Sequence, residues 1–165
     1  DTASKKIELS SSTLAQGGFD PLPNYTPHEE PPDGMFRLLF GRAPTHTFGR
    51  TTNNRLLGSV FGENELWINS VVAKSLDVKN GDRVLLENQD GVRSNPVKAK
   101  VTERIRGDCV YMVHGWGHTS KGLKFAKGRG ASDSELVTRY KTDPIMGGTG
   151  MNVNFVRVLK AEALS

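Results

Sequence analysis

The sequence has little cysteine, few aromatic residues and no long hydrophobic run. Its 165 residues include one cysteine, so no disulfide can form within the chain and the redox compartment is left open. No apolar stretch approaches the roughly 20 residues that span a bilayer, and the first residues lack the apolar core of a signal peptide. These absences favour a soluble mature protein, or a fragment of one, with a core large enough for a single domain.

The single cysteine, Cys109, lies in the strand-like run Cys109–Val113. An apolar setting of this kind predicts a buried and inert thiol rather than a nucleophile or a metal ligand. We therefore assign Cys109 no part in chemistry.

The charges are unevenly distributed along the chain, which carries a net charge of +4. Residues 1–34 hold six acids and five of the eight prolines, a composition that predicts an extended linker or crossing segment. Acids are absent from Met35–Gly62 and from Cys109–Ser132, and each of these segments holds four cations. Two basic segments without acids indicate a shared anionic ligand, although cations that only face water would give the same composition.

The middle of the chain predicts short strands joined by tight turns. Ser70 is a candidate cap for a brief helix over Val71–Leu76, and Gly81 supplies a positive φ in the turn that follows. Pro96 is expected at an edge or bulge of a long strand. This pattern is typical of a closed or nearly closed β-barrel, mainly β with short helices. The expected strands are Glu65–Asn69, Arg83–Asn88, Val92–Ile105, Cys109–His114 and Asn154–Leu159.

Three quoted segments resemble one known family. They are "WINSVVAKSLDVKNGDRVLLENQDGVRSNPVKAKVTERI", the upstream "PTHTFGRTTNNRLL" and the downstream "DPIMGGTGMNVN". In order and spacing they resemble the molybdopterin dinucleotide-binding domain, the C-terminal domain of the dimethyl sulfoxide reductase family, and most closely polysulfide and thiosulfate reductase catalytic subunits. The resemblance implies a six-stranded double-psi β-barrel over residues 35–165.

The resemblance also implies a cofactor and partners. The expected cofactor is bis-molybdopterin guanine dinucleotide carrying Mo or W, in an oxidoreductase that reduces polysulfide or thiosulfate. The metal ligand and the iron–sulfur cluster of this family belong to other domains, so the isolated chain is not expected to be catalytically competent. Expected partners are the remaining domains of the catalytic subunit, an iron–sulfur electron-transfer subunit and a membrane anchor subunit, with no nucleic acid. The expected location is the periplasm, with the cytoplasm as the alternative.

The segment Gly41–Asn54 is rich in neutral polar groups and has no acid. A pterin dinucleotide needs cations for its pyrophosphate and neutral donors and acceptors for its rings, and this segment supplies both. By resemblance His46 looks toward the pterin near the metal. The alternative for Asn53 and Asn54 is that they cap or turn the backbone. The candidate binding residues of this segment are Arg42, His46, Thr47, Arg50, Thr51 and Asn53.

Further candidates lie in two other loops and beside the predicted helix. His114 and His118 have the i, i+4 spacing of a helical zinc pair, but the two glycines between them and the lack of an acidic third ligand argue against a metal site. By resemblance this loop lies beside the cofactor or the substrate funnel, with core packing as the alternative for its tryptophan. A glycine-rich loop near the C-terminus precedes two asparagines, and the sequence does not choose between them. The remaining candidates are Asn69, His114, Trp116, Gly148, Asn152 and Asn154.

Two other classes of function are compatible with the composition. A basic β-barrel that binds single-stranded nucleic acid would need aromatic side chains among the cations, and the basic loops offer few. A structural module that covers a partner subunit would need neither aromatic side chains nor cations in these loops. Binding to generic oligonucleotides indicates the first of these alternatives, and binding to neither oligonucleotides nor guanine nucleotides indicates the second.

Overall fold

The computed structural model describes residues 2, 4–22 and 24–161, and the chain divides between Glu30 and Pro31 into two units. The sequence places this boundary four residues later, after Gly34. The first unit contains the helix α1 (Ser12–Gln16), which begins where the Ser11 side chain accepts a hydrogen bond from the Leu14 amide. Its other described residues form turns and extended backbone without strands.

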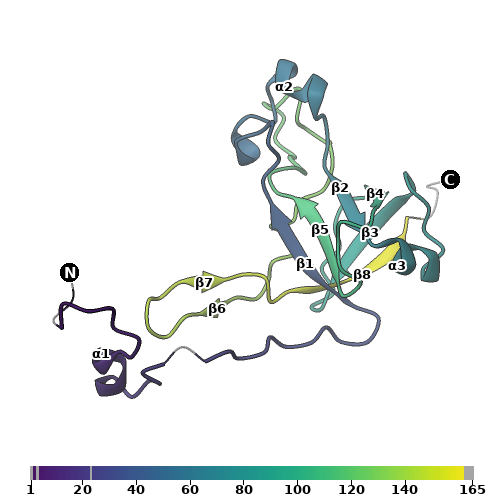
Figure 1. Cartoon of the computed structure of the whole chain (residues 1–165). Coiled ribbons are helices and arrows are strands. Elements are labelled where there is room, and N and C mark those ends of the chain that lie inside the picture. The colour runs from purple at the N-terminus through teal and green to yellow at the C-terminus, as the bar shows by residue number, and fades with distance from the viewer. Residues whose placement is uncertain (1, 3, 23, 162–165) are drawn as a thin grey trace. The chain divides into compact units, whose positions relative to one another are not determined.

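The second unit is built on a closed six-stranded barrel, as predicted (Figure 1). Around the barrel the order is β1-β5-β2-β4-β3-β8, with β1 parallel to β5, β2 parallel to β4, and the other pairs antiparallel. Closure leaves no free sheet edge in the barrel. The strands are β1 (Phe36–Gly41), β2 (Glu65–Ile68), β3 (Arg83–Asn88), β4 (Val97–Val101), β5 (Cys109–Val113) and β8 (Phe155–Lys160).

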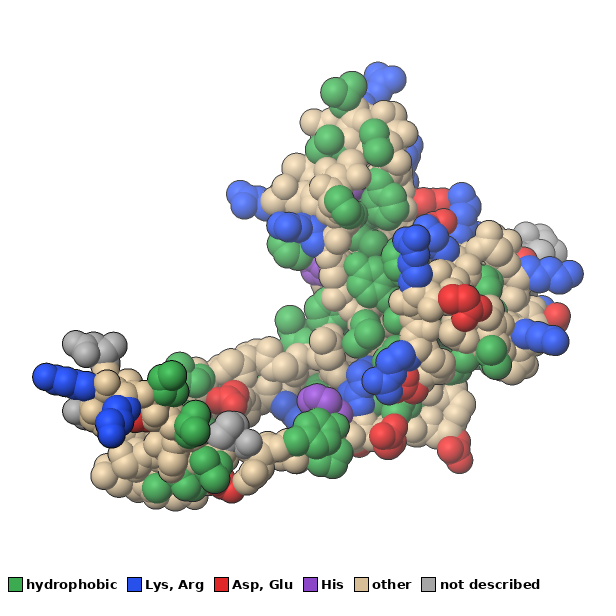
Figure 2. All heavy atoms as spheres, in the orientation of Figure 1, with side chains coloured by type: hydrophobic (Ala, Val, Ile, Leu, Met, Phe, Trp, Pro, Cys, Tyr) green, Lys and Arg blue, Asp and Glu red, His purple; other side chains and the backbone are tan. Residues whose placement is uncertain are grey.

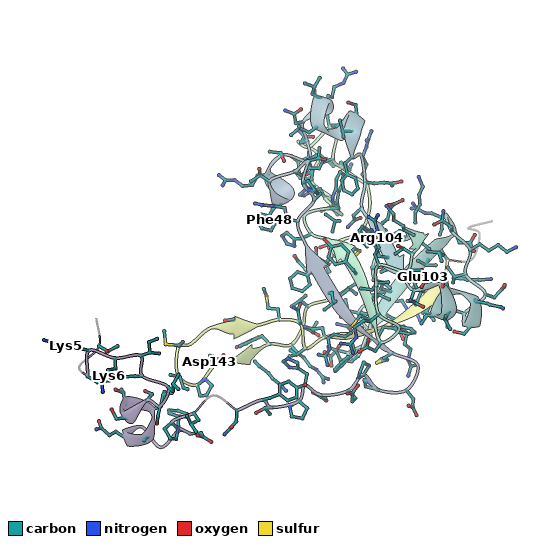
Figure 3. All side chains as sticks on the ribbon, in the orientation of Figure 1. Lys5, Lys6, Phe48, Glu103, Arg104 and Asp143 are labelled. Carbon is teal, nitrogen blue, oxygen red and sulfur yellow. The ribbon has the colours of Figure 1, made fainter. Side chains whose placement is uncertain are left out.

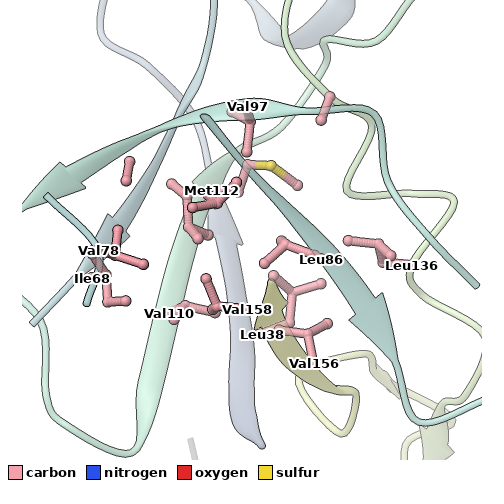
Figure 4. Close-up of a cluster of buried hydrophobic side chains, with 14 of the residues drawn as sticks. Leu38, Ile68, Val78, Leu86, Val97, Val110, Met112, Leu136, Val156 and Val158 are labelled. Atoms are coloured by element: carbon pink, nitrogen blue, oxygen red, sulfur yellow. The ribbon is translucent and has the colours of Figure 1, made fainter. Parts of the chain in front are cut away.

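The barrel interior is filled by aliphatic side chains from every strand (Figure 4). Alternation along β3 sends Val84 and Leu86 inward, and both are fully buried. Leu136, from the segment that follows the barrel strand β5, closes one part of this core. At about 25 cal/mol per Å² of apolar surface, burial of this set is the main term that stabilises the barrel.

Local sequence chemistry sets the element ends, with two differences from the predictions. The helix α3 (Ser70–Ser75) begins one residue early because the Asn69 side chain, and not Ser70, accepts from the Val71 amide. The predicted strand Val92–Ile105 is shorter, with β4 confined to Val97–Val101. Pro96 has no N–H to donate to a ladder, so pairing starts only after it.

Two loops leave the barrel on the same side because β1 and β5 are parallel. They form what we call the loop lobe, residues 42–62 and 114–132. It contains the 3-10 helix η1 (Phe48–Arg50) and α2 (Arg55–Val60), which Asn54 caps. Elsewhere a hairpin of β6 (Lys141–Thr142) and β7 (Thr149–Gly150) connects the lobe to β8 (Figure 1). No helix among the described residues has the length and hydropathy needed to cross a membrane.

Candidate functional site

The polar loop after β1 is ordered around His46. This side chain is 4% exposed, and its Nε2 lies 2.8 Å from the Phe61 carbonyl oxygen. A carbonyl only accepts, so Nε2 donates and Nδ1 of the neutral ring accepts from the Thr51 hydroxyl at 3.3 Å. Thr51 Oγ1 in turn accepts from the Thr47 amide. Both nitrogens of His46 therefore have protein partners, and the ring supports the loop from inside.

The cations of this loop face outward. Arg42 and Arg50 are exposed, and the Arg42 guanidinium lies 5.8 Å from the centroid of the Phe48 ring. Phe48 has a φ of 50°, which is uncommon for a bulky residue, and it lies beyond the end of β1 (Figure 3). On the face shown in Figure 2, separate basic and hydrophobic side chains are spread over the lobe among polar side chains and backbone. The lobe thus offers positive charge without a carboxylate to oppose it.

The loop after β5 begins with a histidine bonded to a buried acid. His114 Nδ1 lies 2.8 Å from Asp133 Oδ2, and Asp133 is 2% exposed. The ring of His114 also contacts Phe48 edge-on, with centroids 5.5 Å apart. Burial, and then the charge of Asp133, raise the pKa of the nearby Tyr111 hydroxyl. The Asp133 carboxyl thus lies inside the protein, and His114 connects it to the surface.

Trp116 packs behind this loop. Its ring is 3% exposed and meets His46 edge-on at 5.3 Å and Phe61 at 5.8 Å between centroids. Ala43 and Val113 complete this second, smaller hydrophobic cluster. Most of the Trp116 surface is therefore packed in this cluster, as the core-packing alternative expects. Its buried Nε1 has no hydrogen-bond partner among the described residues, so one donor in this cluster is left unpaired.

An open groove of about 370 Å³ lies where the two loops meet. Gly49 and Gly115 come so close there that a side chain on Gly115 would collide with the Gly49 backbone. His118 Nε2 bonds to the Thr52 hydroxyl at 2.9 Å, which joins the loops a second time. The lining combines glycine backbone, histidines and hydroxyl groups: Gly49, His114, Gly115, Trp116, Gly117, His118, Thr119, Ser120, Ser132, Asp133 and Ser134.

This set of groups fits a polar heterocycle attached to a pyrophosphate. The acid in the lining, Asp133, is buried and bonded to His114, so it does not oppose an anion directly. Hydroxyls and backbone amides supply neutral donors, and Arg42 and Arg50 stand on the adjoining loop to neutralise phosphate. Among the described residues, no three His, Cys, Asp or Glu side chains gather as a metal site.

The structure brings most of the predicted residues together and places four elsewhere. Arg42, His46, Thr47, Arg50 and Thr51 lie in the loop after β1, and His114 and Trp116 in the loop after β5. Asn53 joins the two parts of the lobe, because its Oδ1 accepts from the Phe125 and Ala126 amides. The predicted residues outside these loops are Asn69, Gly148, Asn152 and Asn154.

Two of those four, Asn69 and Asn154, form hydrogen bonds inside the fold. Asn69 caps α3 and donates to the Ile105 carbonyl, at the opposite end of β5 from His114. Asn154 is fully buried, and its amide bonds to the backbone of Thr138, Arg139 and Met151. Its amide groups are therefore engaged in closing the start of β8.

The other two are exposed in the C-terminal loop. The backbone oxygen of Asn152 accepts a hydrogen bond from the Arg37 guanidinium at 2.7 Å, and the Asn152 side chain faces solvent. Gly148 lies in the β6–β7 hairpin, near Asp143 (Figure 3). The strand β8 begins at Phe155, one residue after the predicted start at Asn154, so both asparagines precede it. Of the two asparagines, Asn152 is the one with an available side chain.

Sequence reasoning missed Asp133. Its signal was its position, because it is the first acid after Asp108 and ends the acid-free stretch. Gly49 and Ser132 were also missed, because a groove lining depends on which loops meet and not on local pattern. His118 was considered only as half of a zinc pair, although its loop was expected beside the cofactor or the substrate funnel.

Comparison with known proteins identifies the family of the domain. A family model described as the molydopterin (molybdopterin) dinucleotide binding domain matches residues 36–155. The thiosulfate reductase molybdopterin-containing subunit PhsA of Salmonella typhimurium is 29% identical over 87% of this chain and 19% of its own length. Dimethyl sulfoxide reductase DmsA of Escherichia coli is 28% identical over 96% of this chain and 21% of its own length.

Two further relatives widen the comparison. The arsenate respiratory reductase molybdopterin-containing subunit ArrA of Chrysiogenes arsenatis is 30% identical over 81% of this chain and 18% of its own length. Among solved structures, acetylene hydratase from Pelobacter acetylenicus superposes with a TM-score of 0.67 and 19% identity, over 97% of this chain and 24% of that chain. The chain thus spans about a fifth of the length of the curated relatives it matches.

Proposed function

The chain belongs to the molybdopterin dinucleotide-binding domain family, and on this premise we propose that its loop lobe and groove hold a molybdopterin guanine dinucleotide. The observation that carries the proposal is the contact of two acid-free basic loops beside one groove, at the ends of the parallel strands β1 and β5. The first loop lines the groove with Gly49, and the segment after β5 supplies the rest of the lining.

The residues of the lobe bind the cofactor in two ways, through positive charge and through hydrogen bonds from neutral groups. Arg50 and Arg42, both exposed on the loop after β1, bind the pyrophosphate. A charge-assisted bond of this kind contributes about 1.5–3 kcal/mol. Hydroxyl groups and backbone amides of the groove form hydrogen bonds to the heteroatoms of the pterin ring. His46 and Asn53 shape the lobe through their internal bonds. When bound, the cofactor supplies a metal centre that exchanges two electrons and an oxygen or sulfur atom with a substrate.

We propose further that this chain is one domain of a longer oxidoreductase catalytic subunit that reduces polysulfide or thiosulfate. Support comes from the name of one relative, a thiosulfate reductase subunit, and from the short share of each relative that the chain spans. The proposal includes Mo or W as the metal, an iron–sulfur cluster in another domain, an electron-transfer subunit with a membrane anchor, and a periplasmic location.

Analysis of cofactor in the full-length protein tests the binding proposal. We expect the purified protein to release GMP on acid hydrolysis, and to contain molybdopterin and close to stoichiometric Mo or W. Protein made in a host that supplies this cofactor, yet free of pterin and GMP, would refute it. The substrate is tested separately, by viologen-linked reduction of thiosulfate, polysulfide, arsenate and dimethyl sulfoxide. Reduction of arsenate or dimethyl sulfoxide alone would reject the substrate class and leave the binding proposal standing.

A further inference from the structure

Asp133 is a buried carboxylate whose side chain bonds to one partner among the described residues, His114. Its Oδ2 accepts from His114 Nδ1 at 2.8 Å, and the acid is 2% exposed. A buried carboxylate is costly to leave without a partner, so this bond holds the imidazole in place. The proposed phosphate contacts do not involve Asp133.

The bond to Asp133 fixes the chemistry of the opposite side of the ring. A carboxylate accepts, so Nδ1 of His114 carries the proton. In the neutral imidazole the other nitrogen, Nε2, is then an acceptor with a lone pair. Within the part of the chain that the structure describes, this Nε2 forms no hydrogen bond, and the side chain is 34% exposed in the lining of the groove.

Aromatic neighbours restrict the ring further. Phe48 meets His114 edge-on with planes at 75°, and Phe40 lies 6.5 Å away between centroids. The second histidine of the groove cannot substitute, because its Nε2 already bonds to Thr52. His114 is thus an oriented acceptor, while the nearby charged groups of the lobe are cations that can only donate.

We propose that His114 Nε2 accepts a hydrogen bond from a ring N–H of the bound pterin, and that Asp133 is the positioning residue that fixes the ring and its tautomer for this contact. The inference rests on the proposed function, because it names a contact to the same cofactor. An oriented acceptor favours a ligand whose edge presents a hydrogen-bond donor, so His114 and Asp133 together determine specificity for the pterin ring. The affinity of this contact adds to the affinity of the arginines for phosphate.

Two substitutions at one position separate this role from a structural one. In His114→Asn the amide takes the place of Nδ1, keeps the bond to Asp133 and removes the acceptor in the groove. In His114→Gln the amide reaches the place of Nε2 and can still accept. We expect His114→Asn to lower the pterin content per full-length protein by about three- to tenfold, the range for one hydrogen bond, and His114→Gln to lower it less.

Glu87→Gln, on the barrel strand β3, is the control for loss of a paired carboxylate, and we expect normal pterin content in it. Equal content in wild type, His114→Asn and His114→Gln would overturn the inference while leaving the proposed function intact. Absence of pterin from the wild-type protein would overturn the proposed function itself, so the two failures are distinct.

The tautomer gives a readout that needs no cofactor. Nitrogen NMR of the 165-residue chain should show His114 protonated at Nδ1. Asp133→Asn should populate the tautomer protonated at Nε2, as the corresponding change does in a serine protease triad. Wild-type chain with the proton on Nε2 of His114, or an unchanged tautomer in Asp133→Asn, would overturn the positioning role.

Discussion

His46 and Trp116 meet edge to face, with ring centroids 5.3 Å apart and planes at 89°. This contact joins the loop after β1 to the loop after β5 behind the groove. The backbone oxygen of Phe61 and the Thr51 hydroxyl engage both nitrogens of His46. The position that resembles a pterin contact in sequence is therefore a support of the lobe in this structure.

We expect His46→Ala to destabilise the chain by about 2–4 kcal/mol, because it leaves a cavity beside Trp116 and strands the Phe61 carbonyl. Urea unfolding measures the loss. Arg42→Ala is the control on the same loop, and as an exposed site it should stay within about 0.5 kcal/mol of wild type. A His46→Ala chain as stable as wild type would show that the ring is not a support.

Arg50→Ala should weaken cofactor retention by about 1.5–3 kcal/mol in the full-length protein, so that apo-protein accumulates. Arg50 is exposed, so the stability of the polypeptide should change little. Pterin and metal analysis of the purified variant measures the effect, with Lys74→Ala on α3 as the control for loss of an exposed cation. Full cofactor in Arg50→Ala would remove this residue from the phosphate site.

The Asn64 side chain should contribute strongly to the stability of the fold. Its amide is fully buried, donates to the Val113 and Ala131 carbonyls and accepts from the Ala131 amide. Asn64→Ala leaves these buried backbone groups without hydrogen-bond partners and should lower the free energy of unfolding by at least about 2 kcal/mol. Asn152→Ala removes an exposed amide and serves as the control in the same urea titration; equal losses in the two variants would contradict the assignment.

Asp90 should contribute an acid-sensitive part of the stability. Hydrogen bonds from Arg139, then Thr138 and Gln89, hold the pKa of this carboxyl at about 2, below its ordinary 3.8. A lowered folded-state pKa means that the contribution is complete above 3.8 and is lost as the pH falls toward 2. Melting temperatures of wild type and Asp90→Asn, measured across this range, should converge at low pH. A constant difference down to pH 2 would exclude this linkage.

Cys109 should react slowly with thiol reagents. Burial, and then the charge of Asp108, raise the pKa of this thiol, so the reactive thiolate is scarce at neutral pH. Iodoacetamide should modify the native chain far more slowly than the urea-unfolded chain. Cys109→Ala should bind cofactor normally and lose about 1 kcal/mol of stability. Fast native modification at neutral pH would mean that the thiol is accessible and ionised.

The sequence by itself determined the barrel and the location of its basic loops. Strand alternation, the turn at Gly81 and the acid-free segments are local properties, and each has a local physical cause. They were enough to predict a closed or nearly closed β-barrel, and the family resemblance implied that it has six strands; the structure confirms both. They also placed Arg42 and Arg50 in the polar segment Gly41–Asn54, and both lie in the loop lobe, Arg50 at the end of η1. His114, expected as the last residue of a strand, lies one residue beyond the end of β5.

The tertiary structure decided which polar side chains are available to a ligand. Asn53 and Asn154 match a binding pattern in sequence, yet their amides bond to backbone that is distant along the chain. Asp133 carried no motif, and it becomes part of a site only because its segment returns beside His114. A hydrogen-bonding group that is engaged inside the fold cannot bind a ligand as well, and its partner is set by packing between distant segments.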